Sequence, residues 1–163
     1  MPARSAGLLM YRLPKGRPEG RLEVFLIHPG GPYWAKKDKG AWAIPKGKYE
    51  QDEEPLVAAQ REFTEETGFI AAGEFLPLGS VQQRSGKNVT AWAFEGDGDP
   101  ADLVSNTCWI EWPPHSGRSL EIPEVDEGRW FGLAEARDYL RKDQEELLDR
   151  LVELLKKQRG PSR

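Results

Sequence analysis

The segment 47–69, GKYEQDEEPLVAAQREFTEETGF, constrains the fold of this chain more than any other segment. Pro55 suits the first turn of a helix, because the N–H that proline lacks would have no intrahelical partner there. Gly68 follows the last residue of the helical pattern, where glycine adopts a left-handed cap at little cost. Between them, four residues recur at helical spacing on one side: Leu56, Ala59, Phe63 and Thr67. The segment therefore predicts a helix with one buried face.

Three carboxylates lie beside that buried face. At about 100° per residue, Glu62, Glu65 and Glu66 fall within an arc of roughly 100° on the predicted helix. Like charges at these spacings repel each other, so the helix alone gains no stability from them. A hard divalent cation would reverse this effect, because carboxylate oxygens are the ligands that Mg²⁺ and Mn²⁺ prefer. The alternative interpretation is an acidic helix face that only contacts solvent.

The full spacing of the segment favours the first interpretation. Every fixed position of the Nudix signature is matched, by Gly47, Glu53, Arg61, Glu62, Glu65, Glu66 and Gly68. The chain therefore resembles the Nudix (MutT-like) hydrolase family. The one departure is Phe63, which is bulkier than the aliphatic residue usual there. The resemblance implies the α/β Nudix fold, an α/β/α sandwich around a central mixed β-sheet, as a single domain over residues 1–163. It also implies a metal-dependent pyrophosphohydrolase that cleaves a nucleoside diphosphate linked to another group.

The resemblance assigns expected roles to individual residues. Three glutamates are expected to hold Mg²⁺, with Mn²⁺ as the alternative ion: Glu62, Glu65 and Glu66. Glu53 is expected to assist, either as a ligand through water or as part of the base system, and Arg61 to orient the acids. Gly47 is expected to allow a close backbone approach that a side chain would block. The general base can lie outside the signature, and Glu124 in the acidic segment IPEVDEG is the candidate for it.

The segment 29–40, PGGPYWAKKDKG, precedes the signature and predicts a substrate loop. Its aromatic rings can stack on a base, and its ammonium groups can meet phosphate oxygens. An exposed polar loop is the alternative, but the closeness of this segment to Gly47 favours binding. Lys46, immediately before the signature, is also expected to contact phosphate. The predicted substrate-binding residues are Tyr33, Trp34, Lys36, Lys37, Lys46 and Gly47.

The approach to the signature indicates a substrate class. Residues 42–47, WAIPKG, resemble the W-x-x-P-K-G sequence of dinucleoside polyphosphate and diphosphoinositol polyphosphate hydrolases. We expect dinucleoside polyphosphates such as diadenosine tetraphosphate, because several lysines suit a long polyphosphate. A diphosphoinositol substrate would need a broader basic pocket, which the net charge does not indicate. Cleavage of oxidised nucleoside triphosphates is a further alternative, and a nucleotide-binding sensor without catalysis is the alternative of another class.

Composition limits the partners of the chain. The formal net charge of −4 argues against a nucleic-acid-binding protein. Cys108 is the only cysteine, which excludes an intrachain disulfide and cysteine zinc clusters and favours a cytoplasmic location. No segment approaches the length of a membrane span, and the N-terminal run MPARSAGLLMYRL predicts a strand rather than a signal peptide. We expect no membrane partner.

Strand signals surround the central helix. Strands are predicted at 5–12, 21–28, 41–45, 75–84, 89–95, 106–112 and 129–131, with a turn at 14–20 and helices from 133 to 140 and from 144 to 157. The last helix has one apolar stripe, formed by Leu147, Leu148, Leu151, Leu154 and Leu155. A helix packed on the core is expected; a dimer helix or an exposed partner-binding stripe is the alternative, so the chain is a monomer or a homodimer. His28 and His115 are expected to be structural or exposed.

Overall fold

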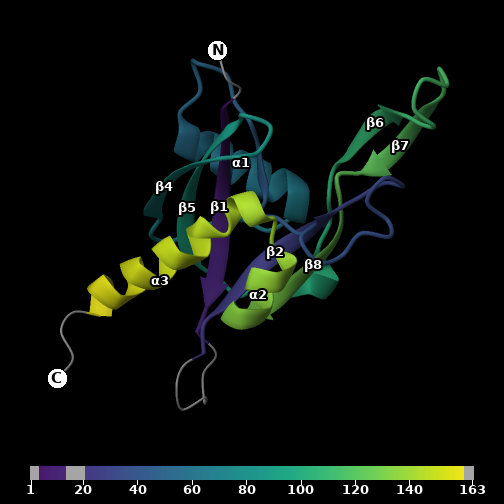
Figure 1. Cartoon of the computed structure of the whole chain (residues 1–163). Helices are drawn as coiled ribbons and strands as arrows, with labels where there is room; N and C mark the ends of the chain where they lie inside the picture. Colours follow the sequence, from purple (N-terminus) through teal and green to yellow (C-terminus); the bar gives the residue numbers. More distant parts are fainter. Residues whose placement is uncertain (1–3, 14–20, 160–163) are drawn as a thin grey trace.

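A computed structural model describes residues 4–13 and 21–159 of the chain (Figure 1). Its strands are β1 (Arg4–Arg12), β2 (Glu23–Pro29), β3 (Lys46–Lys48), β4 (Leu76–Gln82), β5 (Asn88–Glu95), β6 (Thr107–Glu111), β7 (Ser119–Pro123) and β8 (Val125–Gly132). Its α-helices are α1 (Pro55–Thr67), α2 (Leu133–Tyr139) and α3 (Glu146–Arg159), and two short 3₁₀ helices are η1 (Pro100–Asp102) and η2 (Lys142–Gln144).

Six strands form one mixed sheet in the order β4-β5-β1-β2-β8, with β3 paired to β1. β1 runs parallel to β5 along its length, while the other pairs are antiparallel. β3 pairs with residues 5–7 of β1 and β2 with residues 11–12, so β2 and β3 share one edge of β1. This arrangement places the short strand that carries Gly47 next to the centre of the sheet.

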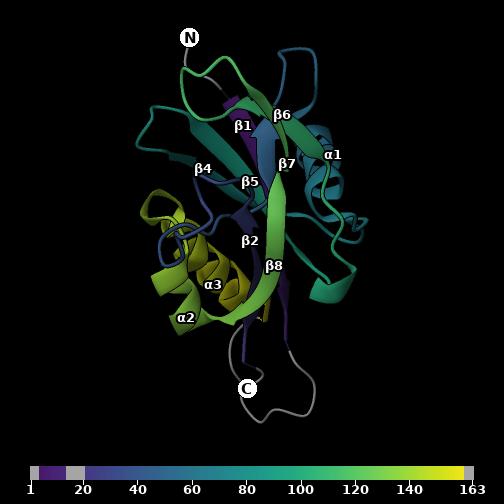
Figure 2. The same cartoon turned by 90° about the vertical axis from the view of Figure 1, so that its right-hand side faces the viewer.

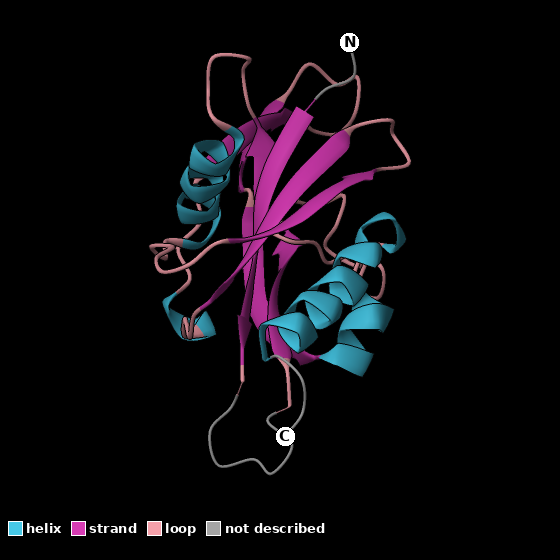
Figure 3. Ribbon diagram, turned by 90° about the vertical axis from the view of Figure 1, so that its left-hand side faces the viewer, coloured by secondary structure: helices cyan, strands magenta, loops and turns pink. Residues whose placement is uncertain are grey.

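Helices cover both faces of this sheet. Figure 3 shows α1 on one side and α2 with α3 on the other, and Figure 2 shows the same layers from the opposite side. Side chains of β1 alternate accordingly: Leu8 and Met10 pack in the core under α1, whereas Leu9 and Tyr11 pack in the core under α2 and α3. The predicted α/β/α sandwich around a mixed sheet is therefore confirmed.

The predicted helix of the signature is also confirmed. Pro55 occupies the first turn of α1, and Gly68 ends it in the left-handed conformation at φ 79°. The Gly68 N–H donates to the carbonyl oxygen of Thr64 at 2.8 Å, which closes the last turn. Ala59 and Phe63 are fully buried against the sheet. The burial of this face fixes which side of α1 carries the glutamates.

The leucine stripe of α3 is buried rather than exposed. Leu147, Leu148 and Leu151 are fully buried in the core under α2 and α3, and Leu154 and Leu155 pack against it. The expected core helix is confirmed, and the alternative of an exposed partner-binding stripe does not hold. α3 is the longest described helix at 14 residues, and no helix among residues 4–13 and 21–159 has the length and apolarity to cross a membrane.

The strands predicted from the sequence differ from those of the structure in three places. In the segment 41–45 only Trp42 and Ala43 form isolated bridges, and the paired strand begins at Lys46. Pro45 has no N–H to donate to a neighbouring strand, so regular pairing starts after it. The sequence also missed β7, whose side chains are mostly exposed and therefore show no apolar alternation. The last predicted strand begins earlier than expected, at Val125, and the predicted turn at 14–20 lies outside the described residues.

The strands β6 and β7 form a separate two-stranded ribbon that projects from the sandwich (Figure 1). Their antiparallel register runs from Thr107 opposite Pro123 to Glu111 opposite Ser119. The returning strand leads directly into β8 through Glu124, whose N–H donates to the carbonyl oxygen of Asn106 at 2.9 Å. The base of the ribbon thus sets the position of Glu124.

Candidate active site

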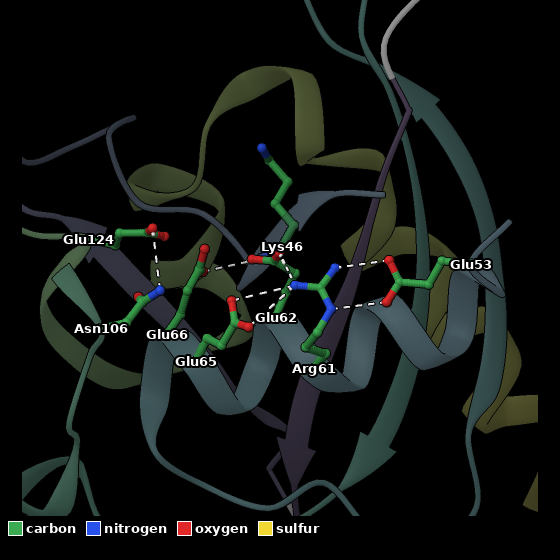
Figure 4. A network of polar contacts seen from close by, with 8 residues as sticks. All are labelled: Lys46, Glu53, Arg61, Glu62, Glu65, Glu66, Asn106 and Glu124. Carbon is green, nitrogen blue, oxygen red and sulfur yellow. Dashed lines mark hydrogen bonds and ion pairs between the residues drawn. The ribbon is translucent and has the colours of Figure 1, made fainter. Parts of the chain in front are cut away.

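Three carboxylates from two parts of the chain converge beside β3. Glu62 and Glu66 come from α1, and Glu124 comes from the junction of β7 and β8; each contributes an oxygen that lies within 4.8 Å of the others. We call these three residues the carboxylate cluster (Figure 4). Glu66 is only 7% exposed. The Asn106 side-chain amide donates to Glu124 at 3.4 Å and holds it toward the helix.

The cluster is electrostatically unfavourable by itself. Burial, together with the nearby charges of Glu124 and Glu62, raises the pKa of Glu66 to about 9. Burial also raises the pKa of Glu62 and of Glu124 above its ordinary value, and neighbouring carboxylates add to both shifts. A divalent cation would remove this penalty, and an all-oxygen donor set of this kind fits a hard ion such as Mg²⁺. The residues present therefore fit the expected metal.

The backbone of β3 contacts two glutamates of the cluster directly. A Cβ atom placed on Gly47 would overlap the Glu62 carboxylate. The glycine therefore makes room for a glutamate of the cluster, which is the close approach expected from the sequence. The Lys46 N–H donates to Glu66 at 3.2 Å. The Lys46 side chain points away from the carboxylates (Figure 4).

Arg61 connects the remaining acids of the signature. Its Nε and Nη2 donate to the two oxygens of Glu53 at 2.9 and 3.0 Å, while Nη1 donates to Glu62 at 2.8 Å and to Glu65 at 3.3 Å. The hydrogen bonds from Arg61 lower the pKa of Glu53. Glu53 and Glu65 thus bond Arg61 rather than join the carboxylate cluster. The third member of the cluster is Glu124, where the sequence analysis expected Glu65. The predicted roles of these residues stay predictions.

The predicted substrate loop lies at two cavities rather than one. Lys36 and Lys37 line a cavity of about 660 Å³, whose other lining residues are His28, Ala35, Asp38, Trp42, Asp126, Glu127 and Arg129. We call it the His28 cavity. Trp34 lines a second cavity instead. Tyr33 is 56% exposed, with the Lys37 ammonium 4.2 Å from its ring centroid. The predicted binding residues of this loop therefore do not lie together in one cavity.

His28 is a residue of this region that the sequence did not identify as functional. It is buried, with Nδ1 2.8 Å from an Asp126 oxygen and Nε2 2.6 Å from the Lys37 carbonyl oxygen. Both partners are acceptors, so an imidazolium that donates from both nitrogens satisfies both. Burial lowers the pKa of His28, but these hydrogen bonds outweigh it and raise the pKa above 6.5. His28 thereby ties the loop to β8.

Arg129 is the second such residue. Its guanidinium lies 4.7 Å from the Phe131 ring centroid and 4.8 Å from that of Trp42, at the wall of the His28 cavity. Its buried Nε has no hydrogen-bond partner among the described residues. From the sequence, the two-residue spacing of Arg129 and Phe131 could only have predicted that both side chains lie on the same face of a strand. Their contact with Trp42 depends on the fold.

A comparison with protein families agrees with this geometry. The family model described as the NUDIX domain matches residues 1–151. The chain belongs to the Nudix family. Its membership confirms the resemblance inferred from the signature. Together with a phosphatase relative, it supports the expected class of enzyme, a Nudix pyrophosphohydrolase.

That relative is an 8-oxo-(d)GTP phosphatase from Mycolicibacterium smegmatis. It is 40% identical to this Nudix domain over an alignment of 118 residues, and the match covers 66% of the chain and 34% of the relative. The chain therefore spans about a third of the length of this curated relative.

Solved structures of low sequence identity share the fold. An Ap4A hydrolase from C. elegans in a binary complex superposes with a TM-score of 0.64 at 20% identity, covering 94% of this chain and 98% of that one. The NUDIX domain of Shewanella oneidensis NrtR, complexed with ADP ribose, gives a TM-score of 0.66 at 15% identity and covers 95% and 89% of the two chains. These similarities confirm the predicted Nudix fold.

Proposed function

We propose that this domain hydrolyses a phosphoanhydride bond of a nucleoside diphosphate derivative with the help of a divalent cation. The observation that carries the proposal is the convergence of Glu62, Glu66 and Glu124, three acids whose mutual repulsion a cation would remove. Glu62 and Glu66 would hold the ion, while Glu65 lies outside the carboxylate cluster and is linked to Glu62 through Arg61. Bound Mg²⁺ would neutralise phosphate charge and make water a better nucleophile.

Other residues position these acids. Arg61 fixes Glu62 and Glu65 from one side and is itself anchored by the two oxygens of Glu53. Glu124 approaches the helix carboxylates from the junction of β7 and β8, and it is our candidate for the general base. In that role it accepts a proton as water attacks phosphorus, and the bond from phosphorus to the bridging oxygen breaks. The leaving phosphate departs with the electron pair of that bond.

Dinucleoside polyphosphates are the substrates that the cavities favour. The His28 cavity offers Lys36, Lys37 and Arg129 to phosphate oxygens and the ring of Trp42 as an apolar wall. The loop 29–40 contributes to a second cavity through Trp34, so a molecule with a nucleoside at each end could use both. Diadenosine tetraphosphate is our first candidate.

An oxidised nucleoside triphosphate is the second candidate. This candidate is supported by the 40% identity, over an alignment of 118 residues, with an 8-oxo-(d)GTP phosphatase. Such a substrate needs one nucleoside subsite rather than two.

A substrate panel tests the proposal. Diadenosine polyphosphates, 8-oxo-dGTP, ADP-ribose and a diphosphoinositol polyphosphate are incubated with the protein and Mg²⁺, and the products are separated by chromatography. We expect the highest kcat/KM for a diadenosine polyphosphate, because this ratio measures discrimination between substrates. Preference for 8-oxo-dGTP would favour the second candidate. Nucleotide binding without product release, with or without Mg²⁺, would contradict hydrolysis and favour a sensor.

A further inference from the structure

The backbone of Glu124 is held on both sides at the junction of β7 and β8. Its N–H donates to the carbonyl oxygen of Asn106 at 2.9 Å, and its carbonyl oxygen accepts the Gly30 N–H at 3.0 Å. A Cβ atom placed on Gly30 would overlap the Pro123 carbonyl oxygen, so the loop 29–40 begins in close contact with this junction. Since the backbone is fixed, the direction of the Glu124 side chain is what remains to be set.

The segment immediately before β6 ties Glu124 to α1. The Asn106 N–H donates to the carbonyl oxygen of Glu65 at 2.7 Å, and the Val104 N–H donates to that of Thr67 at 2.9 Å. These carbonyl groups belong to the last turn of α1, where a helix leaves its carbonyl oxygens without intrahelical donors. Asn106 therefore connects Glu124 with the helix that bears the other two members of the carboxylate cluster.

The side chain of Asn106 sets the direction of the Glu124 carboxylate. Its Nδ2 donates to Glu124 Oε1 at 3.4 Å (Figure 4). Within residues 4–13 and 21–159, no other backbone N–H, hydroxyl, amide or cationic group donates to this carboxylate. Hydrogen bonds of catalytic groups are often this long before the substrate binds.

This orientation of the Asn106 amide has a cost in stability. Its Oδ1 is buried and accepts no hydrogen bond from any described residue. An ionised carboxylate only accepts hydrogen bonds, so the amide has to turn its NH₂ group toward Glu124 and its oxygen into the protein. A buried oxygen without a donor destabilises the fold. A side chain that only filled space would not require this cost, so the orientation indicates a role in holding Glu124.

We propose that Asn106 is a positioning residue for hydrolysis, which directs the Glu124 carboxylate toward the carboxylates of α1. This inference rests on the proposed function, in which Glu124 takes a proton from water as the water oxygen bonds to phosphorus and the bond from phosphorus to the bridging oxygen breaks. Asn106 itself contacts neither Glu62 nor Glu66 through its side chain. It therefore acts on turnover through Glu124 and not on binding of the ion or the substrate.

The test uses Asn106→Ala and Asn106→Asp. Both substitutions remove the donor to Glu124 and leave the backbone hydrogen bonds of residue 106 in place, while aspartate also keeps the shape of the side chain. The control is Thr107→Ala, at the next residue of the chain. Thr107 is exposed, and its hydroxyl donates to Glu121 at 2.7 Å, so the control removes a comparable bond to a glutamate across the same ribbon.

The readout is kcat and KM for diadenosine tetraphosphate with Mg²⁺. We expect both variants of Asn106 to lose about tenfold or more in kcat, with KM within about twofold of the wild type. Thr107→Ala should match the wild type in both constants. A wild-type kcat in either variant of Asn106, or a change confined to KM, overturns the inference. A wild-type kcat in Asn106→Asp alone would show that the side chain acts by packing.

A double-mutant cycle distinguishes positioning from a general effect on the fold. Asn106→Ala is introduced into the wild type and into Glu124→Gln, and kcat is measured for all four proteins. If Asn106 acts through Glu124, Asn106→Ala changes kcat by less than about twofold once Glu124 has been replaced. Losses that multiply, or a wild-type kcat in Glu124→Gln, overturn the inference.

A structural experiment separates this inference from the proposed function. If the wild type cleaves no substrate, the proposed function fails, but crystal structures of the wild type and Asn106→Ala still locate the Glu124 carboxylate. We expect one of its oxygens within 4.8 Å of Glu62 and Glu66 in the wild type, and the carboxylate turned away from both in the variant. The same position of the Glu124 carboxylate in both proteins overturns the inference.

Discussion

At Gly47 the backbone of β3 runs directly against the Glu62 carboxylate. A single added atom would change the geometry of the site here, because any Cβ would occupy the space of the Glu62 carboxylate. The same scale explains Arg61, whose guanidinium bridges three acids by donating to each of them. The site is therefore sensitive to changes that barely affect the rest of the fold.

We predict that Gly47→Ala lowers kcat about 100-fold, because the new methyl group displaces Glu62 from the carboxylate cluster. The circular dichroism spectrum should stay that of the wild type, because the three atoms nearest to the added Cβ all belong to the Glu62 carboxylate rather than to a core side chain. Gly132→Ala is the matched control, since a Cβ there meets nothing within 4 Å and its φ is −65°. Wild-type turnover in Gly47→Ala would show that the position of Glu62 is unimportant.

At the scale of elements, the loop 29–40 is held by side-chain contacts rather than by regular pairing. His28 on β2 bonds both the Lys37 carbonyl oxygen and Asp126 on β8. The folded protein thus favours protonated His28, because its pKa lies above 6.5. The stabilisation is complete below the unfolded pKa and is lost as the pH rises through the folded pKa.

We predict from this sign that His28→Gln lowers Tm more at about pH 5.5 than at about pH 8.5, by a few degrees at the lower pH. Thermal unfolding at both values, followed by circular dichroism, measures the difference. His115→Asn, a change in an exposed loop histidine, should alter Tm equally and little at both. If His28→Gln lost the same stability at both values, the charge on His28 would play no part.

The α3 helix contributes to stability through its buried stripe. We predict that Leu151→Ala lowers the free energy of unfolding by about 2–5 kcal/mol, because Leu151 is fully buried and the residual cavity adds to the lost transfer energy. Urea unfolding measures this change. Val57→Ala on α1 removes methyl groups from a side chain that is 54% exposed and should cost well under about 1 kcal/mol. A similar small loss for Leu151→Ala would indicate that α3 is loosely attached.

At the scale of the whole molecule, the features that could be predicted are those that depend on residues close together in the sequence. The helix of the signature, its proline start and its glycine end follow from a local pattern, and so does the leucine stripe of α3. Glu124 joins Glu62 and Glu66 only because β8 pairs with β2 at the edge of the sheet, which brings the junction of β7 and β8 to α1. No spacing in the chain encodes this proximity.

The carboxylate cluster draws its residues from α1 and from the junction of β7 and β8. The central claim is that the carboxylate cluster holds the cation needed for cleavage of a phosphoanhydride.

Turnover by Glu66→Gln in the presence of Mg²⁺ tests this claim most directly. Glutamine keeps the shape of the buried side chain and an oxygen for the Lys46 N–H, so the fold should persist while a negative charge of the cluster disappears. We predict a loss of kcat of about 100-fold or more relative to the wild type, with an unchanged circular dichroism spectrum. Turnover close to that of the wild type at the same Mg²⁺ concentration would contradict the account.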